Sequence, residues 1–107
     1  MAIIDELIEK YFQEQNWEEH MEEVGRKAAR ATVVAGLHVL CALKGKHHWK
    51  YDTANPRNEH KTAPETIGVL EVRGEHNEYF ITPFGEEVFR RLQEEGLVHE
   101  SNGRYIL

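Results

Sequence analysis

The sequence contains little of what secreted, membrane-spanning or serine-based catalytic proteins need. Its 107 residues include one cysteine, Cys41, and one serine, Ser101. A single cysteine excludes an intramolecular disulfide, so we expect a reducing, cytoplasmic location. A serine at a predicted hairpin turn argues against a Ser-His-Asp triad. The longest apolar run, residues 31–43, is shorter than the about 20 residues of a membrane-spanning helix, and the N-terminus is acidic, unlike a signal peptide.

Metal and cofactor motifs are missing as well. Zinc sites usually combine two paired ligand spacings, and the histidines and the cysteine form no such pairs. His38 and Cys41 lie three residues apart in an apolar stretch, where we expect both to pack as core residues. Lys44-Gly45-Lys46 lacks the spacing of a phosphate-binding loop. We therefore predict a non-enzymatic protein with no metal or other cofactor, no membrane contact and no evident small-molecule substrate.

What the chain does contain is an uneven distribution of charge. Its net charge of −6 divides into −7 for residues 1–24, +6 for residues 25–63 and −5 for residues 64–107. A basic centre between acidic ends indicates either an anionic partner or internal charge complementarity, and both interpretations stay open. By length the chain is a single domain, residues 1–107.

Two helices are predicted in the first part of the chain, residues 1–45. Residues 2–15 place Ile4, Leu7, Ile8 and Tyr11 on one face, as in an amphipathic helix. A second helix is predicted from a capping residue, Asn16, to residue 43.

The second predicted helix needs a break and an end, because it is longer than a small domain requires. Gly25 is the expected break, and Gly45 is the expected left-handed residue after the last turn. The residues expected to trace its apolar face are Trp17, Met21, Val24, Ala28 and Ala31.

The last part of the chain, residues 66–107, predicts a hairpin, a helix and a second hairpin. Residues 62–73 could form a helix instead, but β-branched residues such as Thr66 and Val69 favour a strand, and Gly68 disfavours a helix. Thr82 and Pro83 predict the start of the third helix, with an apolar stripe of Phe84, Val88, Phe89 and Leu92, and Gly96 its end. Asn102-Gly103 predicts a tight hairpin turn. The predicted fold class is therefore α+β.

One motif in this part has a family resemblance. Residues 71–92 read EVRGEHNEYFITPFGEEVFRRL, with an aromatic residue and then an aliphatic-Thr-Pro-x-Gly turn into a helix: Tyr79, Ile81, Thr82, Pro83 and Gly85. This stretch, about a fifth of the chain, resembles the winged-helix regulators of the MarR and PadR type. The resemblance implies a winged-helix-like shape, DNA binding and transcription regulation.

The sequence departs from that family's pattern in two ways. The polar loop with Pro56 and Pro64 leaves little room for a recognition helix before the first hairpin. The helix at residues 83–95 would expose a mixture of glutamates and arginines, which suits phosphates poorly.

The basic loop, residues 46–65, is the candidate nucleic-acid site. Lysines interleaved with Trp49 and Tyr51 could follow a phosphate backbone while the rings stack on bases. The other interpretation is a solvated connection whose bases offset the acids of the first helix. The candidate residues are Lys44, Lys46, His47, His48, Trp49, Lys50, Tyr51, Arg57 and Lys61.

A second candidate surface is the small-residue segment of the second helix. Small side chains let another helix approach closely, so this segment is either a homodimer interface or part of the intramolecular packing. Its candidate interface residues are Ala28, Ala31, Ala35, Gly36 and Val39. We predict a small regulatory protein that binds nucleic acid; the alternative is an acidic protein–protein interaction module, or a dimeric adaptor or inhibitor, that does not.

Overall fold

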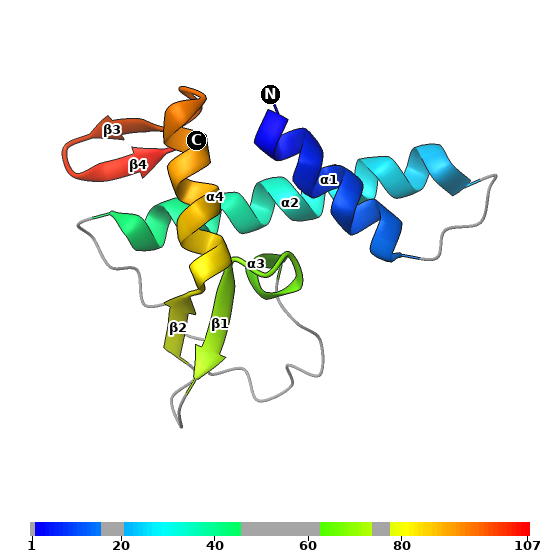
Figure 1. Cartoon of the computed structure of the whole chain (residues 1–107), viewed down its shortest axis with the longest axis horizontal. Coiled ribbons are helices and arrows are strands. Elements are labelled where there is room, and N and C mark those ends of the chain that lie inside the picture. Colours follow the sequence, from blue (N-terminus) through cyan, green and yellow to red (C-terminus); the bar gives the residue numbers. More distant parts are fainter. Residues whose placement is uncertain (1, 16–20, 46–62, 74–77) are drawn as a thin grey trace.

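The fold is α+β and is arranged around one long helix (Figure 1). The computed structural model describes residues 2–15, 21–45, 63–73 and 78–107. Four helices occur there, α1 (Ala2–Glu14), α2 (Glu22–Lys44), α3 (Ala63–Thr66) and α4 (Pro83–Glu94). Two antiparallel hairpins complete the described part, β1 (Leu70–Arg73) with β2 (Glu78–Ile81), and β3 (His99–Ser101) with β4 (Arg104–Ile106).

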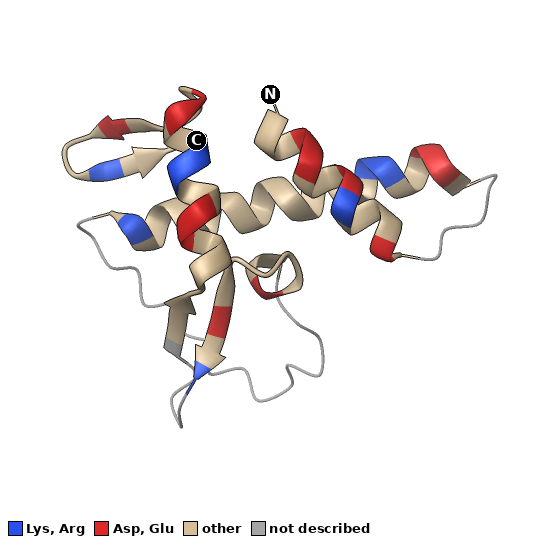
Figure 2. Cartoon of the chain, in the orientation of Figure 1, with Lys and Arg blue, Asp and Glu red and all other residues tan. Residues whose placement is uncertain are grey.

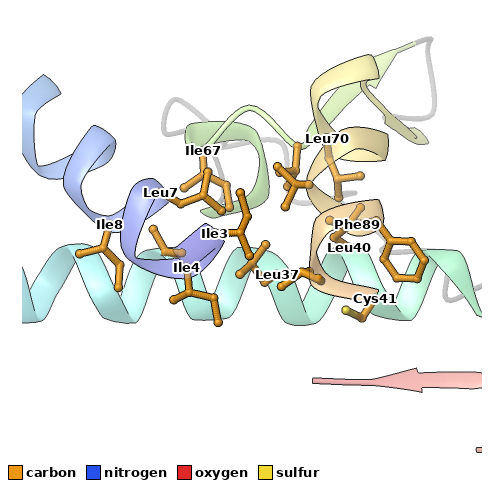
Figure 3. Packing of buried hydrophobic residues seen from close by; sticks show 14 of the residues in the cluster. Ile3, Ile4, Leu7, Ile8, Leu37, Leu40, Cys41, Ile67, Leu70 and Phe89 are labelled. Atoms are coloured by element: carbon orange, nitrogen blue, oxygen red, sulfur yellow. The ribbon is translucent and has the colours of Figure 1, made fainter. Parts of the chain in front are cut away.

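The core lies where α1 and α4 cross the same side of α2. Figure 3 shows Ile3, Ile4, Leu7 and Ile8 of α1 directed onto α2, with Phe89 of α4 further along the same side. The predicted face of the first helix is confirmed, and so is the stripe of α4, apart from Phe84, which is 37% exposed. The fully buried large side chains come from α2, the α3–β1 segment and α4: Val33, Leu37, Leu40, Cys41, Val69, Leu70, Val88 and Leu92.

The side of α2 that faces this core is not the predicted one. Val24, Ala28 and Ala31 were expected to trace the apolar face, but all three are exposed. The buried side is rotated by about half a turn and consists of Gly25, Ala29, Val33, Gly36, Leu37, Leu40 and Cys41. Both sides of this helix are apolar, so periodicity alone could not select the side that α1 covers.

The predicted break in α2 is wrong, whereas its end lies where it was predicted, although without the left-handed residue. Gly25 lies inside the helix, buried on the core side, so the helix continues through it. Gly45 has φ −80° and ψ 169°, an extended rather than a left-handed conformation. Its N–H still donates to the Ala42 carbonyl, at 3.3 Å, and closes the last turn. The predicted start at Asn16 lies outside the described residues.

A short helix replaces the start of the predicted first strand. α3 occupies residues 63–66, partly within the predicted loop of residues 46–65, and β1 begins only at Leu70. Gly68 has φ +81°; its N–H donates to Glu65 and that of Val69 donates to Pro64. These two bonds form a Schellman motif, which satisfies the carbonyls at the end of a helix. Gly68 therefore ends a helix, whereas the β-branched residues had favoured a strand.

The predicted end of α4 and the predicted turn of the second hairpin are confirmed. Gly96 has φ +71° and ends α4 with the same pair of bonds, from Gly96 to Gln93 and from Leu97 to Leu92. Asn102 and Gly103 both have positive φ, 52° and 80°, as the tight turn between β3 and β4 requires.

The N-terminus of α4 is joined tightly to the α3–β1 connection. The Thr82 hydroxyl accepts a hydrogen bond from the Gly85 N–H at 2.9 Å and donates to the Gly68 carbonyl at 2.6 Å. The Thr82 N–H donates to the Val69 carbonyl at 3.1 Å. A Cβ on Gly85 would lie only 2.1 Å from that carbonyl oxygen, so the contact needs glycine. This contact explains the glycine of the Thr-Pro-x-Gly turn.

Replacing Gly85 with alanine should therefore destabilise the protein. Helix propensity alone would favour alanine by about 1 kcal/mol. The overlap with the Val69 carbonyl should outweigh that gain, and we expect a net loss of about 1–3 kcal/mol in the free energy of unfolding. Urea unfolding of Gly85→Ala measures it, with Gln93→Ala on the exposed side of α4 as the control. A stabilised Gly85→Ala variant would show that the close contact does not form.

The first turn of α1 receives its hydrogen-bond acceptor from the opposite end of the chain. The Ile3 N–H donates to both carboxylate oxygens of Glu95, at 3.2 and 3.1 Å. Arg91 contacts Glu95 at 3.2 Å and also pairs with Glu6 of α1. The carboxylate satisfies a free N–H at the positive end of the α1 dipole. Glu95 and Arg91 thus tie α1 to the C-terminal turn of α4.

Glu95 can be compared with its neighbour Glu94, which pairs with Arg90 on the surface of α4. Glu95→Ala should lower the free energy of unfolding by about 1 kcal/mol, because the N-terminal turn of α1 loses its acceptor. Glu94→Ala should cause little change, since that pair is exposed to solvent. Thermal and urea unfolding of the two variants test this; equal losses would mean that Glu95 does not cap α1.

Candidate protein interface on α2

Most of the predicted nucleic-acid site lies outside the described residues. These positions are Lys46, His47, His48, Trp49, Lys50, Tyr51, Arg57 and Lys61. Lys44 is the described member, and it is held by α4: its Nζ lies 2.7 Å from Glu86 and 5.1 Å from the centre of the Phe89 ring. An ammonium group with these two partners neutralises a carboxylate of its own chain.

The exposed side of α4 is also neutralised internally. Arg90 pairs with Glu87 and with Glu94, one turn away on either side. Figure 2 shows the acidic and basic residues following one another along α4. The Arg90 guanidinium lowers the pKa of Glu87 below its ordinary value, mainly through their hydrogen bond, so this carboxylate stays charged at neutral pH. Acids alternate with bases along this side, which therefore does not form a basic strip.

The side of α2 that points away from the core has a different character. It carries Val24, Ala28, Ala31, Ala35, His38 and Ala42, which we call the outer face. The first five are exposed, Val24 to 53%, and Ala42 is half-buried. Lys27 lies at one margin of the outer face, the other charged residues of α2 lie on other sides of the helix, and Figure 2 shows its central part without any. The outer face is thus apolar except for His38.

The predicted interface residues divide between two sides of α2. Ala28, Ala31 and Ala35 belong to the outer face. Gly36 does not: it is buried, and a Cβ on it would lie 2.7 Å from Cδ1 of Ile67 and 3.3 Å from the Ala63 backbone. Gly36 therefore allows α3 to pack closely within the same chain. Val39 is half-buried, at the margin of the outer face.

A groove continues the outer face at its C-terminal end. It has a volume of about 500 Å³ and separates the end of α2 from β4. Tyr105 fixes β4 there, because its ring meets Phe89 of α4 edge-on, with 5.0 Å between the ring centres. Ile106 at the rim is 53% exposed. The residues that line the groove are His38, Val39, Ala42, Gly45, Arg104, Tyr105 and Ile106.

His38 and Cys41, which lie close together in the sequence, have different surroundings in the structure. His38 is exposed whereas Cys41 is buried, so the expectation of a core histidine is wrong and the two side chains diverge. Burial raises the pKa of the Cys41 thiol to about 11, which keeps it protonated at neutral pH. Within the described ranges, no three His, Cys, Asp or Glu side chains lie close enough to hold a metal ion.

Comparison with known proteins does not assign a function to the outer face or to the groove. No family model, curated protein or solved structure matches the chain. In the part that the structure describes, no helix has both the length and the apolar character needed to cross a bilayer.

The groove is the feature that the sequence did not predict. It requires β4 to lie beside the end of α2, a contact between segments about 60 residues apart. One signal in the sequence pointed toward the outer face: residues 31–43 are apolar around the whole helix, which leaves a second side available for another contact.

Proposed function

We propose that this chain is a small non-enzymatic protein-binding module, and that its contact surface is the outer face of α2 together with the adjoining groove. One observation carries the proposal. From Val24 to Ala42, about 27 Å along the helix, a solvent-facing strip carries no charged residue, and Lys27 lies at its margin. The exposed side of a helix is normally polar, and contiguous exposed apolar surface is typical of an interaction site.

We further propose that the second half of the chain is winged-helix-like and serves this surface. α4 is followed directly by the β3–β4 hairpin, the order of a recognition helix and its wing. The edge-on contact of Tyr105 with Phe89 holds this hairpin beside α2. In this arrangement the hairpin forms one wall of the groove, and the paired charges of α4 are not required to contact phosphate.

Nucleic-acid binding is the competing function. It rests on the basic residues between 46 and 61, and the described residues add little to it. Of the nine described lysines and arginines, six take part in ion pairs with glutamates: Arg26, Lys27, Lys44, Arg73, Arg90 and Arg91. Phosphate contacts would have to replace these pairs, whereas the outer face needs no such exchange.

Titration with labelled duplex and single-stranded DNA separates the two functions. We expect no binding at about 50 mM or about 200 mM salt. Binding that weakens steeply with salt, with a slope lowered by about one unit in Lys46→Ala and in Lys50→Ala, would overturn the proposed function. Loss of single-strand binding in Trp49→Ala, with the slope unchanged, would indicate a stacking contact.

A photo-cross-linking amino acid at position 35 gives the positive test. In extracts of the native cells, we expect protein adducts from position 35, because it lies in the centre of the outer face. The matched control is position 2, an exposed alanine of α1. Equal adducts at both positions would show that the outer face is not a preferred contact surface.

A further inference from the structure

We infer that the outer face of α2 binds the outer face of a second copy, with the two helices antiparallel and Val24 of each copy seated in the groove of the other. This inference rests on the proposed function and names its partner. Three properties of the surface support it: the symmetry of its spacing, the sizes of its side chains and the direction of the helix dipole.

The spacing of the outer face is symmetric about residue 33. Its members are separated by four, three, four, three and four residues along the helix. An antiparallel pair with its twofold axis level with Val33 therefore places Val24 opposite Ala42, Ala28 opposite His38, and Ala31 opposite Ala35. Every residue of the face meets another residue of the same face, as a twofold interface requires.

The side-chain sizes suit this alignment. The centre consists of Ala31 and Ala35, which allow two helix axes to approach to about 8 Å. At each end, Val24 is the larger exposed side chain, and the position opposite it borders the groove of about 500 Å³. Ile106 at the groove rim provides a further apolar contact. A protruding residue at one end thus meets a hollow at the other.

The helix dipoles favour the antiparallel orientation over the parallel one. Within one chain, Glu22 and Glu23 of the first turn of α2 pair with Arg26 and Lys27, and Lys44 of the last turn pairs with Glu86. The two ends of α2 therefore differ mainly in the helix dipole, which is positive at the first turn and negative at the last. An antiparallel pair opposes the two dipoles, whereas a parallel pair places like ends side by side. No charged residue of the outer face itself needs to be buried.

Sedimentation velocity on the full chain tests the association. We expect a dimer with a Kd below about 100 μM, and Ala31→Glu should raise that Kd by about tenfold or more, because two carboxylates would meet near the axis. The exposed Ala2→Glu should leave the Kd unchanged. A monomeric wild type at about 100 μM overturns the inference.

A pair of variants with opposite charges tests the same contact in case Ala31→Glu alone is unstable. Residues 31 and 35 face each other, so Ala31→Glu mixed with Ala35→Lys should form a heterodimer at least about tenfold tighter than either homodimer. Two well-folded variants, as judged by circular dichroism, that fail to associate when mixed would contradict the inference.

Cysteine cross-linking tests the orientation. Val24→Cys and Ala42→Cys should form a disulfide when the two proteins are mixed, whereas neither should cross-link with itself, because like positions lie about 27 Å apart. Cys41 is 1% exposed and stays in place in both variants. Self-cross-linking of Val24→Cys would mean a parallel pair and overturn the inference.

The two proposals fail in different measurements. A monomeric wild type whose position 35 still forms adducts with another protein overturns self-pairing but leaves the protein-binding function. Salt-dependent DNA binding by the wild type overturns the proposed function whatever the oligomeric state.

Discussion

The contact between the start of α4 and the α3–β1 connection is the constraint on which the rest of the fold depends. Thr82 binds the carbonyls of both Gly68 and Val69, and Gly85 lets the helix come against the Val69 carbonyl. This contact sets where α4 begins relative to the first hairpin, in which Leu70 is paired with Ile81. Val88, Phe89 and Leu92 then reach the core beside α2, and the second hairpin follows from the end of α4. The position of the groove between α2 and β4 therefore depends on this contact at the start of α4.

α2 has two apolar sides, and the proposed function rests on the side that the core does not use. The inner side is covered by α1, α3 and α4, with Gly36 allowing the close approach of α3. The outer side is left to solvent in the single chain, although its composition resembles a contact surface more than a solvated one. An additional contact on the outer side would remove the remaining apolar surface of α2 from water without changing the inner packing.

The surface charges of the described residues work mainly within the chain. Arg91 of α4 contacts Glu6 of α1 and Glu95 just after α4, Arg26 joins Glu9 of α1 to Glu22 of α2, and Lys44 joins α2 to Glu86 of α4. Exposed pairs of this kind contribute little stability individually, but they neutralise the basic side chains of these helices. Of the two interpretations of the charge distribution, internal complementarity accounts for the described part of the chain.

Local chemistry was enough to predict the elements whose ends are set by a few neighbouring residues. Thr82-Pro83 start α4, Gly96 ends it and Asn102-Gly103 turn the second hairpin, because caps and tight turns depend on backbone conformations within four or five residues. Only the tertiary structure decided which side of α2 is buried, that Glu95 caps α1, and that β4 forms a groove with α2. Each of these depends on contacts between segments distant in the sequence. In a helix that is apolar on both sides, the elements packed against it determine which side is buried.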